Sequence, residues 1–274
     1  MSFFRNLFGY QVVRDDAVAL IFEQVHLRKF FERFEVDCVF DVGANRGQYA
    51  AMLRKHVGYK GPIVSFEPIP TLAKKLESKA AGERGWFIEN YAIDNEVGEK
   101  TFYVMKTDCF SSLHPPTADE VGKDQFRGKN EVRETVTVKT TPLAPMFDKY
   151  LAQLNFKRPF LKLDTQGHDL EIARNAGALL KSFVGLQSEL SIKRIYEDSA
   201  EYTAVIDYYR SVGFELSAFV PNNLGHFPRL IETDCIMYNS AVLAAAERPQ
   251  RRHENDRDEH AGDLADHRKH AERG

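Results

Sequence analysis

The sequence predicts an α/β protein built on a doubly wound, mostly parallel β-sheet. Strand-like apolar segments alternate with amphipathic helical segments along most of the chain, which is typical of β–α–β units. Two strand-to-helix junctions carry a glycine, Gly43 and Gly167. The chain of 274 residues is 43% hydrophobic, which is enough to bury one sizeable core and is short for two independent domains.

The first part of the chain shows this alternation most clearly. Apolar residues at helical spacing predict a helix over 15–34 that covers one edge of the core. Pro68 and Pro70 predict the start of another helix directly after a strand. The predicted elements after the first helix are, in order, strand 36–43, helix 47–57, strand 62–67, a helix to about residue 80, and strand 86–92.

The alternation breaks between about 97 and 141 and then resumes. Segments 100–105 and 134–139 read as half-buried strands around a long polar connection, so we expect an inserted β pair. The connection either covers a site or is disordered, and both interpretations stay open. The later predicted elements are helix 142–154, strand 160–164, helix 169–182, strand 184–188, helix 199–212, and strands 214–220 and 233–238, which brings the main sheet to seven strands.

These elements predict three regions: an N-terminal helical cap over 1–35, one catalytic domain over 36–243 and a charged, disordered tail over 244–274. The tail lacks apolar faces that could offset the entropy of ordering. Its three evenly spaced histidines could bind metal, but exposed histidines in such a tail are more often incidental. They are His253, His260 and His267.

Charge and composition narrow the partners. A net charge of −3 provides no cationic field for a nucleic acid, so we expect a small-molecule or glycan substrate. Three scattered cysteines suit a reducing cytoplasm, and no apolar run is long enough for a transmembrane helix. The Phe-rich segment 3–8 fits either a helix packed on its own domain or one lying on a membrane surface. The sequence leaves a homo-oligomer open.

The segment 36–47 predicts a nucleoside-cofactor site. Gly43 permits a turn that a side chain would block, and Gly47 lets the next helix close on the sheet and present its free N–H groups. Glu67 ends the next strand, where a carboxylate can accept both hydroxyls of a ribose.

The residues of this turn favour one class of nucleoside cofactor over another. A dinucleotide site normally has a glycine where this chain has Asn45, because the backbone must approach a pyrophosphate closely. Asn45 therefore favours a smaller ligand such as S-adenosylmethionine, with Asp41 accepting from its ammonium group. A nicotinamide cofactor is the alternative.

The junction at 161–171 predicts the reacting groups. Because strand ends converge on one crevice, Asp164 is expected near the reactive end of the cofactor. Asp164, His168 and Glu189 are candidates for a general base. Lys162 lies on the same strand face as Asp164. As an alternative to the role of general base, Asp164 could therefore form an ion pair with Lys162.

A magnesium hypothesis draws on the same region. Asp164, Asp169 and Glu189 are oxygen ligands of the kind that Mg²⁺ prefers, but no dedicated ligand spacing is visible and we assign no metal site. Asp169 is more simply interpreted as a cap of the following helix. Asp234 either holds substrate or caps a turn.

Taken together, the segments resemble the FkbM family of S-adenosylmethionine-dependent methyltransferases, a class I Rossmann-like group. The resemblance covers about 36–240. It is carried by the motifs at 40–47, 66–70, 92–94, 111–113, 161–171 and 232–238. It implies that Asp94 contacts the adenine amino group and that Ser112 belongs to the cofactor site. The family's junction often has another residue at His168, so the resemblance gives that histidine no role as a base.

The resemblance implies O-methylation of a hydroxyl on a sugar, glycolipid, polysaccharide or macrolide-type metabolite. Two alternatives stay open. One is an NAD(P)-dependent sugar dehydrogenase or epimerase, although the expected Tyr-x-x-x-Lys is missing near the crevice. The other is a non-catalytic assembly subunit that binds S-adenosylmethionine.

Overall fold

The computed structural model describes residues 18–117, 131–221 and 228–247. The Phe-rich N-terminus, residues 118–130 of the polar connection and the tail from residue 248 lie outside the described residues, and so do the tail histidines. The chain divides into two units with the boundary after Ser240, and each is described by itself.

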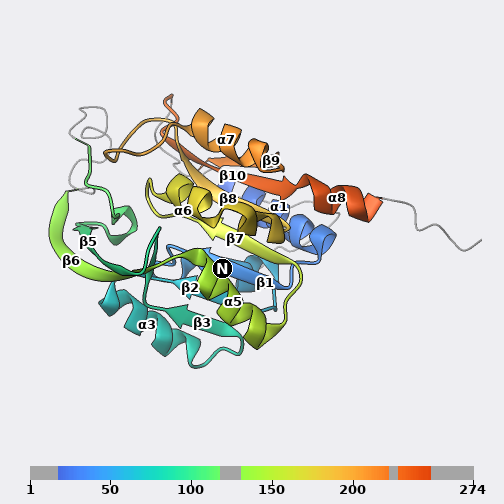
Figure 1. Cartoon of the computed structure of the whole chain (residues 1–274), viewed down its shortest axis with the longest axis horizontal. Coiled ribbons are helices and arrows are strands. Elements are labelled where there is room, and N and C mark those ends of the chain that lie inside the picture. Colours follow the sequence, from blue (N-terminus) through green and yellow to red (C-terminus); the bar gives the residue numbers. More distant parts are fainter. Residues whose placement is uncertain (1–17, 118–130, 222–227, 248–274) are drawn as a thin grey trace, which may run out of the picture. The chain divides into compact units, whose positions relative to one another are not determined.

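The first unit is built on a seven-stranded sheet of strand order β3-β2-β1-β7-β8-β10-β9 (Figure 1). The first five strands in this order, β3, β2, β1, β7 and β8, are parallel to one another. Strand β10 runs antiparallel to both of its neighbours, β8 and β9. This confirms the predicted doubly wound, mostly parallel, seven-stranded sheet. The strands are β1 Cys38–Val42, β2 Ile63–Phe66, β3 Trp86–Glu89, β7 Pro159–Leu163, β8 Gly185–Ser191, β9 Phe214–Pro221 and β10 Glu232–Asn239.

A smaller sheet accounts for the inserted β pair. Strands β5 (Gly98–Met105) and β6 (Val132–Thr141) are antiparallel, and β4 (Ala92–Ile93) adds to β6. The predicted strand 86–92 is wrong in one respect, because it is divided between the two sheets. The Asn90 side-chain amide donates to the carbonyls of Glu67 and Pro68, at 2.8 and 3.0 Å, where the chain leaves the first sheet.

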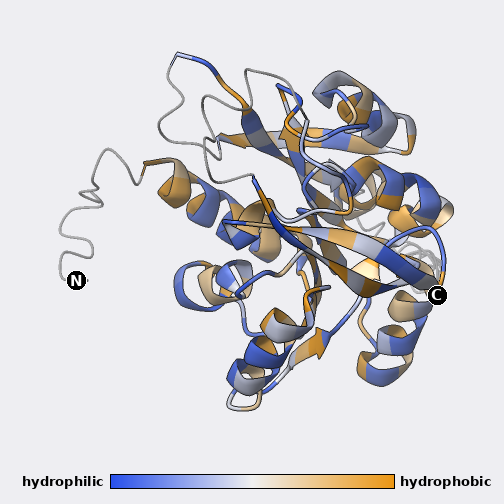
Figure 2. Cartoon of the chain, turned by 90° about the vertical axis from the view of Figure 1, so that its left-hand side faces the viewer, coloured by the Kyte–Doolittle hydropathy of each residue, from blue (hydrophilic) through white to orange (hydrophobic). Residues whose placement is uncertain are grey.

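Helices cover both faces of the large sheet. On one face Phe40 of β1 packs against Phe147 of α5, with ring centroids 5.7 Å apart. On the other face Phe30 and Phe31 of α1 pack against Phe160 of β7. Figure 2 shows the helices as ribbons of mixed hydrophilic and hydrophobic residues, as amphipathic cover requires. The helices of this unit are α1 Val18–Phe34, α2 Gln48–Met52, α3 Pro70–Ala80, α5 Leu143–Leu154, α6 Asp169–Ala176 and α7 Tyr202–Ser211. A further helix, α8 Ser240–Glu247, begins at the boundary between the units, and its residues after Ser240 belong to the second unit.

Two predicted helices are interrupted, and one helix was not predicted. Helix 47–57 is α2 followed by a π-helical turn over Leu53–Val57, and helix 169–182 changes to a 3₁₀ turn at Gly177, whose φ is 51°. Helix α8 occupies 240–247, where the predicted tail begins. Within the part of the chain that the structure describes, no helix is both long and apolar enough to cross a membrane.

Candidate functional site

A cavity of about 550 Å³ lies at the carboxyl ends of the central parallel strands. Residues that end β1, β2 and β7 line it, among them Val42, Phe66 and Asp164. This is where doubly wound sheets bind ligands, and the volume is that of a small-molecule site.

The glycine turn after β1 forms one wall of the cavity. Gly43 has a φ of +82°, and a Cβ atom at this position would come within 1.9 Å of the Asp164 carbonyl oxygen. The N–H groups of Gly43 and Ala44 both donate to the Phe66 carbonyl, at 3.1 and 3.0 Å. Only glycine therefore fits where the turn meets the ends of both β2 and β7.

Gly47 acts behind this wall. Its φ is +80°, and a Cβ atom here would meet Leu76 of α3 and Trp86 of β3 at 2.9 Å. Gly47 does not line the cavity. In the structure this glycine allows close packing at the start of α2.

Glu67 lines the cavity and is held by the backbone. Its side chain accepts the N–H of Asn45 at 2.7 Å through Oε2 and the N–H of Ile69 at 2.8 Å through Oε1. Burial raises the pKa of Glu67 to about 8, although the two N–H groups act in the opposite direction. A buried carboxylate fixed in this way has lone pairs left for ribose hydroxyls.

Lys162 of β7 forms the charged floor. Its ammonium group lies 3.1 Å from Asp164 Oδ2, 3.5 Å from Asp41 Oδ1 and 3.3 Å from the Gly43 carbonyl oxygen. Burial alone would lower the pKa of Lys162, but the Asp164 and Asp41 carboxylates outweigh it and raise that pKa. The predicted Lys162–Asp164 ion pair is confirmed.

Asp41 occupies a different place from the one expected. Its side chain is fully buried, accepts a hydrogen bond from Ser65 at 3.0 Å and does not line the cavity. Burial raises the pKa of Asp41. The carboxylate lies beneath the surface of the cavity, where it holds Lys162 and cannot reach a ligand's ammonium group directly.

Sequence reasoning missed three residues of a polar wall. The Gln187 side-chain amide of β8 donates to Glu23 of α1 at 2.8 Å and to Asp234 at 2.7 Å, and it accepts from the Tyr49 hydroxyl at 3.0 Å. All four residues line the cavity, and burial raises the pKa of Glu23. A glutamine within an apolar strand was the one available signal, since nothing distinguishes Glu23 within an amphipathic helix.

The opposite part of the cavity is apolar. Next to Glu67 the lining consists mainly of aliphatic and aromatic side chains, which suit the face of an adenine ring. They include Ile69, Tyr91, Ile93, Phe102 and Leu113.

Four further predicted site residues lie outside the cavity lining. Asp94 is buried and bonds to His168 and Lys100. Ser112 donates to the Gln166 carbonyl at 2.7 Å. His168 is turned toward Asp94, which leaves it no position for a general base at the cavity. Glu189 accepts from the Gln166 side chain at 2.7 Å, and burial raises its pKa.

The structure also argues against the expected roles of Asp169. Its carboxylate accepts from the backbone N–H of Thr165 at 2.8 Å and from the Ser188 hydroxyl at 2.9 Å, so it ties the junction to β8. The N-cap position of α6 is His168. Among the described residues Asp164, Asp169 and Glu189 do not form a group whose ligand atoms could share one ion.

Comparison with known proteins agrees with this geometry. The model of the family "Methyltransferase FkbM domain" matches residues 41–216. The 31-O-demethyl-FK506 methyltransferase FkbM of Streptomyces tacrolimicus is 32% identical over 136 residues, which are 48% of this chain and 48% of that protein. The alignment thus spans about half of the relative's length.

Solved structures with a similar fold include two methyltransferases. Methyltransferase FkbM from Methylobacillus flagellatus KT has 13% identity and a TM-score of 0.43, with 74% of this chain and 44% of that chain covered. Magnesium protoporphyrin IX methyltransferase from Synechocystis PCC 6803, solved with bound S-adenosylmethionine, has 10% identity and a TM-score of 0.44, with 85% and 88% covered.

The family model begins within β1, at the turn that carries Gly43, and ends within β9, so it includes both strand-to-helix junctions that border the cavity. It spans more than half of the residues, and the chain therefore belongs to the FkbM family of S-adenosylmethionine-dependent methyltransferases.

Proposed function

We propose that the protein transfers a methyl group from S-adenosylmethionine to a hydroxyl of a sugar, glycolipid, polysaccharide or macrolide-type metabolite. The observation that carries the proposal is the position of Asp164. Its carboxylate borders the cavity at the end of β7, directly beside the Gly43 turn. O-methylation needs a group that takes the hydroxyl proton as the new bond forms, and Asp164 is a carboxylate in that place.

The residues present fit the cofactor. Glu67 would accept the ribose hydroxyls, the neighbouring apolar lining would hold the adenine ring, and the turn at Gly43 would hold the methionine part. The cofactor would supply a methyl group on its sulfonium centre, and the neutral thioether that remains after transfer is a good leaving group.

Asp164 is held in one orientation. Lys162 donates to its Oδ2 at 3.1 Å, and the Gln166 side-chain amide donates to its Oδ1 at 2.9 Å. Two donors on separate oxygens fix the carboxylate, which is partly exposed, with a side-chain exposure of 40%. Alignment of this kind contributes most of the catalysis in an in-line displacement.

The polar wall supports a hydroxyl-rich acceptor. Glu23, Gln187 and Asp234 place oxygen acceptors along the side of the cavity opposite the apolar lining. A sugar or polyol can donate further hydrogen bonds to these oxygens through its many hydroxyls, whereas a purely apolar acceptor would make no polar contact with the wall.

We also infer that the protein acts in the cytoplasm. Cys38, Cys109 and Cys235 are free thiols, as a reducing compartment allows. Helix α1 packs on the sheet through Phe30 and Phe31, which supports a cap role for the described part, 18–34, of the predicted cap.

The test uses the purified full chain. Titration calorimetry with S-adenosylmethionine, S-adenosylhomocysteine and NADH is followed by incubation of methyl-labelled S-adenosylmethionine with a panel of monosaccharides, oligosaccharides and macrolides. We expect both sulfur compounds to bind, NADH not to bind, and label to appear as a methyl ether.

The outcomes separate the hypotheses. Binding of NADH alone would establish a dehydrogenase-type cofactor site and reject the proposal. Transfer to amines but not to hydroxyls would reject O-methylation and keep the cofactor. Binding without transfer to any acceptor of the panel would favour the assembly subunit over the enzyme.

A further inference from the structure

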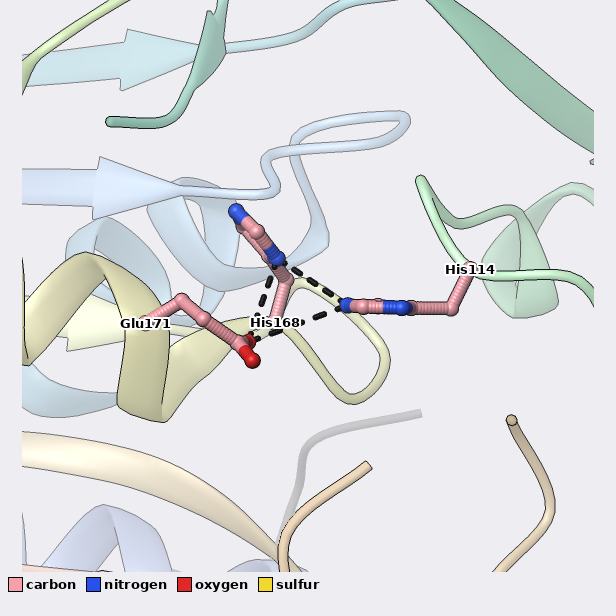
Figure 3. Close-up of side chains that lie close together, drawn as sticks. All are labelled: His114, His168 and Glu171. Atoms are coloured by element: carbon pink, nitrogen blue, oxygen red, sulfur yellow. Dashed lines mark hydrogen bonds and ion pairs between the residues drawn. The ribbon is translucent and has the colours of Figure 1, made fainter. Parts of the chain in front are cut away.

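Three side chains with metal-ligating atoms converge outside the cavity (Figure 3). His114 Nε2 lies 3.0 Å from His168 Nδ1, and Glu171 Oε2 lies 3.2 Å from His168 Nδ1 and 3.7 Å from His114 Nε2. Among the described residues, this is the group of His, Cys, Asp and Glu side chains whose ligand atoms all lie within 4.8 Å of one another.

Local structure explains why the three side chains meet. His168 is the N-cap of α6, and Glu171 follows three positions later on the same side of the first turn. His114 comes from the segment after β5, which bonds to the same junction because the Ser112 hydroxyl donates to the Gln166 carbonyl. The cluster therefore joins two segments that are far apart in sequence.

A buried carboxylate fixes the proton of His168. His168 Nε2 lies 2.9 Å from Asp94 Oδ1, and Asp94 is itself buried and paired with Lys100. A carboxylate accepts hydrogen bonds, so Nε2 must carry the hydrogen and the neutral ring presents the Nδ1 lone pair to His114 and Glu171. Metal-binding histidines usually have such a carboxylate on their other ring nitrogen.

We propose that His114 Nε2, His168 Nδ1 and Glu171 Oε2 bind one divalent ion of the zinc class. Zinc–ligand bonds of about 2.0–2.2 Å at a tetrahedral angle separate neighbouring ligand atoms by about 3.4 Å. The observed separations of 3.0, 3.2 and 3.7 Å bracket this value. Two imidazoles and one carboxylate suit zinc rather than magnesium, which prefers an all-oxygen site.

The electrostatics of the cluster favour a cation. Two lone pairs and an ionised carboxylate repel one another unless a proton or a metal ion lies between them.

The ion would fix part of the cavity wall. The segment that carries His114 also carries Ser111 and Leu113, which line the cavity. Hydrogen bonds at both ends already place this segment, through the bridges Tyr103–Ser112 and Pro116–Tyr196. A metal ion that joins His114 to α6 would attach the segment at a third point, between these two bridges. The ion would therefore position the cavity wall and take no part in the reaction.

The test measures metal binding directly, on untagged full-length protein. After dialysis against a chelator, titration calorimetry with ZnCl₂ is expected to show one tight site per chain, and MgCl₂ is expected to show none. Addition of CoCl₂ should give the visible absorption of tetrahedral cobalt. The variants His114→Ala and Glu171→Gln should each weaken zinc binding at least about tenfold, the loss typical even of an outer-shell partner.

Matched variants separate this site from other histidines. A variant with His253, His260 and His267 replaced by alanine should keep the tight site, because those residues lie in the charged tail. Asp94→Asn tests the orientation of His168 and should weaken zinc binding by about 10–100-fold. Circular dichroism confirms that each variant is folded. Zinc binding that is absent in the wild type, unchanged in both ligand variants, or lost only with the tail histidines would overturn the proposal.

Discussion

Glu67 combines two properties that usually exclude each other, deep burial and a role in binding. Its side chain is 3% exposed, yet it lines the cavity and already accepts two backbone N–H groups. Those bonds fix the carboxylate, but they do not remove the cost of ionisation, since its pKa is raised to about 8. Hydrogen bonds from ligand hydroxyls would stabilise the ionised form of Glu67, which burial disfavours.

This shift predicts a pH-dependent affinity for S-adenosylmethionine. Donation from ribose hydroxyls favours the ionised form, so binding should lower the pKa of Glu67 and release a proton below about pH 8. Affinity should rise by up to about tenfold per pH unit toward pH 8 and then level off. Calorimetry in buffers of different ionisation enthalpy measures the proton release, and Glu67→Gln should abolish it. Equal affinity across this range in the wild type would contradict the assigned role.

The free protein should show the opposite trend in stability. The folded-state pKa of Glu67 lies above its ordinary value of 4.5, so its contribution to stability is complete below 4.5 and is lost as the pH rises through about 8. This sign follows from burial of the neutral acid, and S-adenosylmethionine should weaken the trend.

Asp164 carries the second prediction at this scale. Asp164→Asn keeps the shape of the side chain and removes the proton acceptor, so methyl transfer should fall by about a hundredfold or more while cofactor affinity changes little. Initial rates and calorimetry on the same preparation measure the two quantities. Asp207→Asn is the control, since Asp207 is exposed on α7. Full activity of the Asp164 variant would leave the base to another residue of the cavity, such as Asp234 or Glu23.

At the scale of elements, the turn between β1 and α2 depends on how closely two strand ends approach. Gly43 and Gly58 have nearly the same φ, +82° and +85°, but a Cβ at Gly43 would meet the Asp164 carbonyl oxygen at 1.9 Å, whereas one at Gly58 meets nothing within 4 Å. Gly58→Ala should cost about 1–2 kcal/mol of stability from backbone strain alone. Gly43→Ala should cost clearly more and weaken cofactor binding. Equal losses in urea unfolding would show that φ alone matters at Gly43.

Helix α1 supports the cavity through its packing on the sheet. Phe30 is 4% exposed and lies against Phe160, and the absence of a side chain at Gly185 leaves room for its ring. Phe30→Ala should destabilise the protein by about 3–5 kcal/mol. Phe22→Ala, on the same helix but 47% exposed, should cost about 0.5 kcal/mol or less. Chemical unfolding compares the two, and similar losses would mean that α1 is not anchored by Phe30.

For the whole molecule, periodicity predicted the seven-stranded sheet and the inserted β pair because both depend on apolar patterns that a strand must keep. The points at which predicted strands and helices are interrupted were not predictable from periodicity. The division after β3 depends on Asn90 donating to two distant carbonyls, and the end of α6 depends on the positive φ of Gly177. Such details are set by tertiary contacts and not by local propensity.

The cavity shows the same division between local and tertiary information. Gly43, Asn45, Glu67 and Asp164 lie at strand ends, and these predicted residues do line the cavity. His168 and Asp94 also follow strands, but they bond to each other instead of facing the cavity. Spacing places a residue at the correct edge of the sheet, whereas the direction of its side chain depends on partners from other elements.

Stabilisation of the whole molecule by its cofactor gives the last prediction. A ligand that binds only the folded state adds about 2.7 kcal/mol at about 100 times its Kd. For a chain of this size each kcal/mol corresponds to about 2–4 °C in Tm, so S-adenosylmethionine and S-adenosylhomocysteine should each raise Tm by about 5–10 °C. NADH should leave Tm unchanged, because Asn45 takes the place of the glycine at which a pyrophosphate would approach the turn. Differential scanning calorimetry of the wild type and of Glu67→Gln, whose shift should be smaller at equal cofactor concentration, measures this effect. A shift with NADH and none with either sulfur compound would refute the assignment of the cavity.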